Sequence, residues 1–232
     1  MKTAVGTRAE KAKERAMELR RYDSDFCESE GQLIAGVDEV GRGCLAGPVV
    51  AACVILKSDF EGIGIDDSKK LSEKKREELF SEIINNSLAI GIGTVDNAKI
   101  DEINILNATK IAMRTAVNEA DEKLEEKGKQ ISKVLIDAVD IGEIRNSNGE
   151  IIELLPVIKA DQKSMAVAAA SIVAKVTRDR LMIEFSEKYG DYAFEKNKGY
   201  GTKEHYDGIK KTGITEIHRK TFLKNLNWRE KS

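Results

Sequence analysis

The chain has 232 residues, of which 41% are hydrophobic and 34% are charged. This composition is typical of a globular protein with one or two domains and a substantial core. The longest apolar run, residues 49–56, is far too short to cross a bilayer. The charged N-terminal region has no apolar segment, so we expect neither a membrane anchor nor a secretory signal.

The net charge of −2 hides an uneven distribution. Residues 195–232 hold 10 Lys and Arg against 5 Asp and Glu, which leaves the remainder of the chain acidic. A basic end on an acidic body suits a polyanionic partner, although most Lys-rich ends are simply solvated helices. The three cysteines (Cys27, Cys44 and Cys53) form no Cys-x-x-Cys pair. They indicate neither a zinc site nor a disulfide framework, and we expect a reducing, cytoplasmic location.

The hydrophobic pattern predicts strands that alternate with helices along the chain. In chain order we expect a charged helix over 8–22, strands over 33–40 and 49–56, a polar loop over 66–70, a helix over 72–84 and a strand over 88–95. A helix over 101–127, strands over 134–138 and 151–158, a long helix over 162–188 and one or two short basic helices follow. This order indicates a layered α/β fold.

The first predicted strand ends in two adjacent acids, Asp38 and Glu39, followed by Gly41, Arg42 and Gly43, here called the glycine turn. Neighbouring side chains of a regular strand point to opposite faces. The two acids therefore reach one site only if the strand bends or if a metal ion is approached from two sides. Glycines let a backbone approach a ligand closely. Acids beside such a turn indicate a divalent cation next to a phosphate-bearing substrate. The alternative is a polar turn with solvated acids.

Two further acids also lie at the end of a predicted strand or at the entrance of a predicted helix. Asp137 lies at the end of an apolar strand, where it is either part of a site or exposed to water; Asp161 precedes the long helix, where it is either part of a site or the helix cap. Sites of open α/β sheets gather at such strand ends. Four converging carboxylates need a cation, and ligands without His or Cys favour Mg²⁺ or Mn²⁺. Such a cluster can hold two ions that act on a phosphodiester.

Other motifs are weaker. The third glycine, Gly47, comes one residue too late for a dinucleotide-binding turn, and there is no phosphate-binding lysine loop. Tyr200 lies between glycines in a Lys-rich stretch, where it either stacks on a nucleotide or anchors a loop. His205 and His218 either contact phosphate or have capping and packing roles.

Together these motifs resemble the type 2 ribonuclease H (ribonuclease HII) family. The resemblance extends from about Leu33 to Phe222, and the residues that carry it are 36–52, 67–71, 161–164, 168–175, 199–202 and 218–219. It implies a ribonuclease H-like α/β fold, with a mixed five-stranded sheet flanked by helices and a helical C-terminal extension. We expect a charged N-terminal segment over 1–30, a catalytic domain over 31–190 and a basic extension over 191–232 packed on it.

The resemblance further implies a metal-dependent endonuclease that acts on RNA–DNA hybrids and on ribonucleotides embedded in DNA. It assigns catalysis and two Mg²⁺ or Mn²⁺ ions to Asp38, Glu39, Asp137 and Asp161. It assigns substrate binding to Gly41, Arg42, Gly43, Lys69, Ser164 and Tyr200. Cys44 stands where many relatives have Pro. We expect a monomer. The alternatives are a non-catalytic nucleic-acid-binding protein and a related metal-dependent DNA nuclease.

Overall fold

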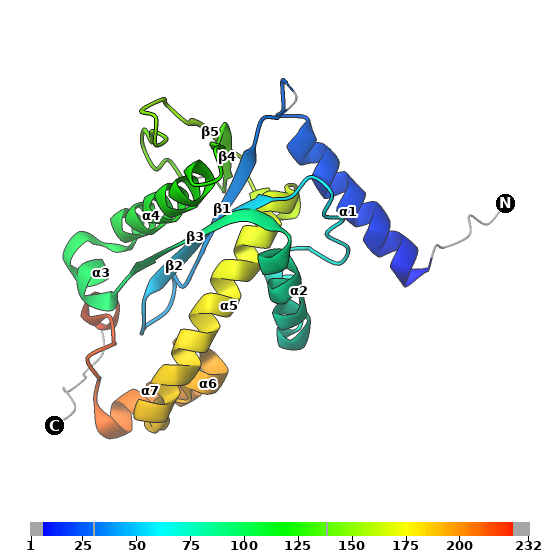
Figure 1. The fold of residues 1–232 in the computed structure, drawn as a ribbon. Coiled ribbons are helices and arrows are strands. Elements are labelled where there is room, and N and C mark those ends of the chain that lie inside the picture. Colours follow the sequence, from blue (N-terminus) through cyan, green and yellow to red (C-terminus); the bar gives the residue numbers. More distant parts are fainter. Residues whose placement is uncertain (1–6, 30, 138, 225–232) are drawn as a thin grey trace.

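The computed structural model describes residues 7–29, 31–137 and 139–224. Its centre is a mixed sheet of five strands in the order β3-β2-β1-β4-β5 (Figure 1). β1 pairs antiparallel with β2 and β2 with β3, whereas β4 runs parallel to both β1 and β5. The strands are β1 (Ile34–Val40), β2 (Val49–Leu56), β3 (Ser87–Val95), β4 (Lys133–Ile136) and β5 (Glu153–Pro156). The predicted fold class is therefore confirmed.

Helices cover both faces of the sheet (Figure 1). One face packs against α4 (Ile105–Glu125), and the other packs against α5 (Met165–Lys188) and α2 (Glu73–Asn85). β2 is buried on both faces, because Ala51 and Cys53 point toward α4 while Ala52 and Val54 point toward α5. This two-sided burial explains why β2 reads as a continuous apolar run rather than an alternating one.

The N-terminal helix α1 (Arg8–Ser24) packs against the α5 side of the sheet and places Ala16 and Leu19 in that core. Arg15 Nη2 donates to the Gln162 carbonyl at 2.5 Å, and the Ala166 N–H donates to Asp23 Oδ2 at 2.9 Å. Through these bonds α1 supports the loop that leads into α5. The predicted division of the chain into three parts remains a prediction.

Several predicted boundaries are wrong. The single helix expected over 101–127 is two helices, α3 (Asn97–Ile103) and α4, separated by Asn104 at φ 69°. Asn104 combines this positive φ with ψ 163°, which ends α3, and its side chain caps α4 by accepting from the Asn107 N–H. The loop expected over 66–70 contains a 3₁₀ turn, η1 (Ser68–Lys70). β4 and β5 are shorter than expected, and Ala138 lies outside the described residues.

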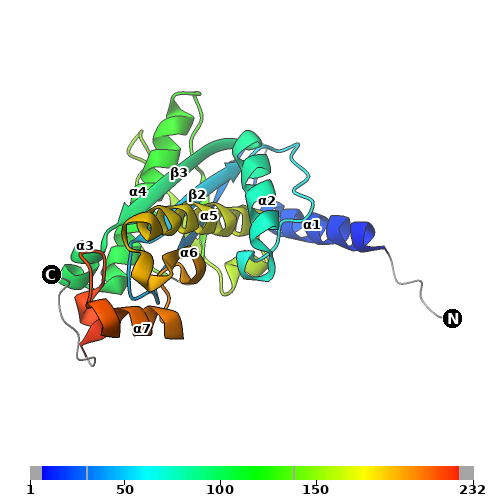
Figure 2. The same ribbon diagram turned by 90° about the horizontal axis from the view of Figure 1, so that it is seen from below.

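The C-terminal extension packs against the far end of α5 with a small core of its own (Figure 2). It contains α6 (Phe194–Asn197) and α7 (Lys203–Thr212), with 3₁₀ turns at Gly190–Tyr192 and Lys220–Leu223. Residues 225–232 of the predicted extension lie outside the described residues. Among the helices that the structure describes, none has the length and apolar character needed to cross a membrane.

A buried pair of histidines fixes this extension internally. The Thr215 N–H donates to His218 Nδ1 at 2.9 Å, so the ring proton of neutral His218 lies on Nε2. That proton points at His205 Nε2, 3.0 Å away, so the His205 proton lies on Nδ1, where it donates to the Tyr200 carbonyl at 3.0 Å. The Thr215 hydroxyl also lies 2.9 Å from His218 Nδ1. Each ring thus uses one nitrogen as an acceptor and the other as a donor, which requires both rings to be neutral. The alternative that these histidines contact phosphate is therefore wrong.

We predict that this pair makes stability fall in mild acid. Burial lowers the pKa of His205, and burial together with the nearby His205 lowers that of His218 to about 3. A depressed folded-state pKa gives stability that is complete above the unfolded value and is lost as pH falls toward the folded value. Between pH 6.5 and 5 the wild type should lose about 2 kcal/mol more unfolding free energy than His218→Asn. Urea titrations measure this, and parallel pH profiles of the two proteins would contradict it.

Candidate active site

The carboxyl ends of β1 and β4 bring the first acids together. The two strands are parallel, and Val37 pairs with Ile136, so Asp38 and Asp137 are the next residues along each strand. Both parallel strands therefore deliver an acid to the same edge of the sheet. Sequence alone predicts that strand ends gather, but only the pairing of β1 with β4 makes these two acids neighbours.

β1 stays regular through its acids. Asp38 pairs with Ala52 and Glu39 with Ala51, without a register shift. Opposed residues of an antiparallel pair share a face, so Asp38 lies on the α5 side and Glu39 on the α4 side. The bend that would have placed both acids on one face is therefore absent from β1, and a shared ion would have to be approached from two sides.

Asp38 is buried, with 8% of its surface exposed. Burial, followed by the charges of Glu39 and Asp161, raises the pKa of Asp38 well above its ordinary value. A hydrogen bond from Ser171 on α5 opposes that shift, and the Ser171 hydroxyl lies 2.6 Å from that of Ser68. Asp38 thus links the sheet edge electrostatically to the loop that carries Asp161.

Asp161 lies in a 3₁₀ turn, η2 (Ala160–Gln162), and is not the cap of α5. The cap is Ser164, whose side chain accepts from the Val167 N–H at 3.1 Å. Burial and the charge of Asp67 raise the pKa of Asp161, and Asp137 adds to this shift. The helix-cap interpretation of Asp161 is therefore wrong. Ser164 is fully buried and offers no surface to a substrate in this structure.

Asp137 is half-buried at the end of β4. Its Oδ1 accepts from the Lys159 N–H at 2.9 Å and lies 3.5 Å from the Ala160 nitrogen. Asp161 follows directly after Ala160, so this contact ties the last two predicted acids to one another. Asp137 is neither a fully exposed strand end nor a buried unpaired charge.

Lys69 extends from the η1 loop toward the acids, and its Nζ lies 3.7 Å from Asp161 Oδ2. Burial lowers the pKa of Lys69, but the charges of Asp161, Asp38, Asp67 and Asp137 outweigh that effect and raise it. The ammonium therefore lies in the combined field of the acids. The sequence predicts a substrate role for Lys69 but no role for Asp67, although Asp67 directly precedes Ser68 and Lys69 in the motif.

The four acids provide only carboxylate oxygens to a metal ion. Within the described residues, no three side chains of Asp, Glu, His or Cys lie close enough together to hold one ion as they stand. The chemistry of the donor set nevertheless fits Mg²⁺ or Mn²⁺, because it consists of carboxylates alone. Burial is the largest cause of the raised pKa of Asp38 and of Asp161, and the charges of neighbouring acids add to it; a divalent cation would relieve that repulsion.

The glycine turn follows β1 directly. Gly41 has φ +95°, and a Cβ atom added to it would lie 2.3 Å from Nε of Arg178, so only glycine fits there. Gly43 has open space where its Cβ would be. Arg42 is exposed, and its Nη1 lies 3.2 Å from Glu39 Oε1. The turn therefore presents an open backbone beside the acids.

Tyr200 lies near this turn, because the Leu45 N–H donates to the Gly199 carbonyl at 2.8 Å. The Tyr200 hydroxyl interacts with Cys44, and burial of that end raises the pKa of Tyr200 to about 12. The residue is still 40% exposed, and Lys175 Nζ lies 5.9 Å from the centre of its ring. Tyr200 therefore offers a ring face to a ligand while its hydroxyl end is anchored.

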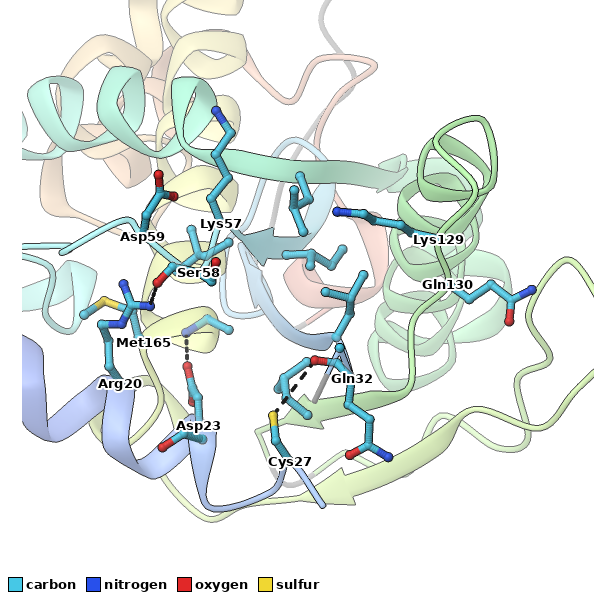
Figure 3. A pocket seen from close by; sticks show the side chains of 18 of the residues that line it. Arg20, Asp23, Cys27, Gln32, Lys57, Ser58, Asp59, Lys129, Gln130 and Met165 are labelled. Carbon is cyan, nitrogen blue, oxygen red and sulfur yellow. Dashed lines mark hydrogen bonds between the residues drawn. The ribbon is translucent and has the colours of Figure 1, made fainter. Parts of the chain in front are cut away.

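A separate cavity of about 1080 Å³ lies at the opposite end of β1. Figure 3 shows Arg20, Asp23, Gln32 and Lys129 around it. None of the predicted site residues lines this cavity. The acids and the glycine turn thus form the candidate site on chemical grounds, apart from this cavity.

Comparisons with known proteins bear on the family of this chain. The family model for ribonuclease HII matches residues 35–230. The ribonuclease HII of Listeria innocua is 51% identical over 206 residues, covering 89% of this chain and 74% of that protein. The ribonuclease HII of Clostridioides difficile is 47% identical over 216 residues, covering 93% of this chain and 80% of that protein.

Solved structures share the fold. The crystal structure of ribonuclease H2 from Pyrococcus horikoshii matches with a TM-score of 0.65 and 29% identity, over 82% of this chain and 93% of that one. The complex of PCNA with ribonuclease HII from Archaeoglobus fulgidus matches with a TM-score of 0.59 and 31% identity, over 77% of this chain and 87% of that one. The family match over most of the chain, together with relatives near half identity, shows that this chain belongs to the ribonuclease HII family and is a ribonuclease H enzyme.

Proposed function

We propose that the enzyme hydrolyses the RNA strand of RNA–DNA hybrids and also cuts duplex DNA on the 5′ side of an embedded ribonucleotide. The products would carry a 3′-hydroxyl and a 5′-phosphate. Membership of an enzyme family contradicts the non-catalytic alternative.

One observation carries this proposal: the acids and the glycine turn lie together at the carboxyl end of β1. The charge of Asp161 contributes to the raised pKa of Asp38, and the charge of Asp137 contributes to that of Asp161. All three acids also raise the pKa of Lys69. The glycine turn starts two residues after Glu39 on the same strand end. A nuclease that reads a 2′-hydroxyl needs this proximity, because that hydroxyl lies on the sugar next to the reacting phosphate.

We assign the ions to Asp38, Glu39, Asp137 and Asp161. Two bound Mg²⁺ or Mn²⁺ ions would supply the positive charge that stabilises the attacking water and the departing 3′ oxygen. Lys69 now lies against Asp161. Once cations neutralise the acids, this ammonium is free to hold a phosphate oxygen of the substrate, which accounts for its position in the field of the acids.

The remaining predicted residues hold the nucleic acid. Backbone groups of the glycine turn would hydrogen-bond the 2′-hydroxyl, and the exposed ring face of Tyr200 would stack on a sugar or base. Exposed lysines of α7, such as Lys203 and Lys210, would hold the DNA strand through its phosphates without reading its sequence. The proposal therefore separates chemistry on the sheet edge from strand binding on the extension.

The test is a labelled DNA duplex with one ribonucleotide, incubated beside its all-deoxy twin in Mg²⁺ and in Mn²⁺. We predict cleavage of the first duplex and a preference of roughly 10⁴-fold or more over the second. A site built to bind a hydroxyl leaves its own polar groups unpaired when that hydroxyl is missing. Equal cutting of both duplexes would instead support the DNA nuclease alternative.

A second prediction concerns Asp38. Asp38→Asn removes one charge from mutually repelling acids, so without divalent ions it should raise the free energy of unfolding by about 1 kcal/mol at neutral pH. The same variant should not cleave the ribonucleotide duplex. Asp59→Asn is the control, because Asp59 is exposed and distant from the site. Thermal unfolding and single-turnover cleavage measure the two effects. A less stable or fully active Asp38→Asn protein would contradict this assignment.

A further inference from the structure

Two arginines lie wholly buried behind the glycine turn. Arg178 comes from α5 and Arg219 from the segment that follows α7, and neither has exposed surface. Within the described residues neither forms a salt bridge with an acid. Burial lowers the pKa of Arg219 to about 10, which leaves it charged at neutral pH. Buried charges without an acidic partner are costly for folding, which points to a role in the groups that these two side chains bind.

Both guanidinium groups bind main-chain carbonyls. Arg178 donates from Nε to Pro48 at 2.8 Å, from Nη1 to Lys198 at 2.7 Å and from Nη2 to Ala46 at 3.0 Å. Arg219 donates from Nε to the Gly47 carbonyl at 3.0 Å and from Nη1 to the Arg42 carbonyl at 2.9 Å. Four of the five acceptors thus lie between residues 42 and 48, and the fifth lies two residues before Tyr200.

The glycine turn has little internal support of its own. The one backbone bond recorded across its described residues runs from the Cys44 N–H to the Gly41 carbonyl, and at 3.4 Å it is long. Gly41 packs directly on the Arg178 side chain. The conformation of the turn therefore depends on the two arginines more than on bonds within it.

The hydrogen bond from Arg219 to the Arg42 carbonyl also fixes the direction in which the next N–H of the backbone points. In a trans peptide the carbonyl and the following N–H point to opposite sides. The Arg42 carbonyl points inward to Arg219 Nη1, so the Gly43 N–H points outward. Gly43 is the position of the turn with open space around it. This N–H thus points away from the buried arginines, at a residue that is exposed.

We propose that Arg219, supported by Arg178, is a positioning residue that aims the Gly43 N–H at the 2′-hydroxyl of the substrate ribonucleotide. This inference rests on the proposed function, because it names the group that would read the sugar. Arg219 itself contacts no substrate. Its remaining nitrogen, Nη2, is buried without a hydrogen-bond partner. A buried donor without a partner lowers stability, so this arginine serves to orient the glycine turn more than to stabilise the fold.

The direct test follows the Gly43 amide in protein labelled with ¹⁵N-glycine. The protein is titrated, without divalent ions, with the single-ribonucleotide duplex and with its all-deoxy twin. In the wild type the Gly43 signal should shift differently with the two duplexes. Arg219→Lys keeps the positive charge but has a single nitrogen in place of the fork, so this difference should disappear. A wild-type Gly43 signal that responds identically to both duplexes would overturn the inference, as would a retained difference in Arg219→Lys.

Kinetics separate orientation from mere loss of stability. Arg219→Lys should lower kcat/KM for the single-ribonucleotide duplex at least about tenfold, the effect of one lost charged hydrogen bond. Gly91→Ala is the destabilised control, because its added Cβ would lie 2.0 Å from the Ala116 carbonyl oxygen, far from the turn. Arg180→Met is the control for a surface arginine of α5. Both controls should stay within about twofold of wild type; a tenfold loss in Gly91→Ala would overturn the inference.

Failure of the proposed function would look different. If the wild-type enzyme cuts both duplexes equally in Mg²⁺, the ribonucleotide is not recognised at all, and the function itself is wrong. If the wild type and Arg219→Lys prefer the single-ribonucleotide duplex over the all-deoxy duplex to the same degree, the proposed function is supported and the positioning role of Arg219 is wrong.

Discussion

The parallel pairing of β1 with β4 is the constraint on which the rest of the site depends. Its register makes Asp38 and Asp137 neighbours at one edge of the sheet. The Asp137 carboxylate then accepts the Lys159 N–H, which fixes the loop that carries Asp161. β1 also ends at this edge, so the glycine turn has to emerge there. A shift of one residue in this pairing would move Asp137 to the other face of the sheet and separate the acids.

Acidic and basic side chains lie in separate places around that edge. Burial and the charges of neighbouring acids raise the pKa of Asp38 and of Asp161, and Lys69 supplies a partial counter-charge from an exposed loop. Behind the glycine turn, Arg178 and Arg219 place two buried cations against backbone carbonyls. The acids suit divalent ions, while the cations hold the backbone that would face the sugar. We thus propose that the acids carry out catalysis, while the backbone that the two buried arginines hold recognises the sugar.

Much of this arrangement could be predicted from sequence, because it follows local rules. The strands stand out by their apolar runs, and acids at strand ends are expected to gather. What could not be predicted depends on contacts distant in the chain. Ser164 rather than Asp161 caps α5, and nothing local distinguishes the two. His205 and His218 resemble phosphate ligands until their mutual hydrogen bond is seen. Arg178 reads as a polar position of a long helix, although it is buried against residues 46–48.

The central claim is that the four acids form one site for divalent ions. The most direct measurement is a titration of ¹⁵N-labelled protein with Mn²⁺, whose paramagnetism broadens the signals of nearby amides. The account predicts that substoichiometric Mn²⁺ first broadens the amides of Asp38, Glu39, Asp137 and Asp161, together with that of Lys69. Broadening that starts at the opposite end of β1, around Asp23, would contradict it. Broadening spread evenly over the acidic surface would do so as well.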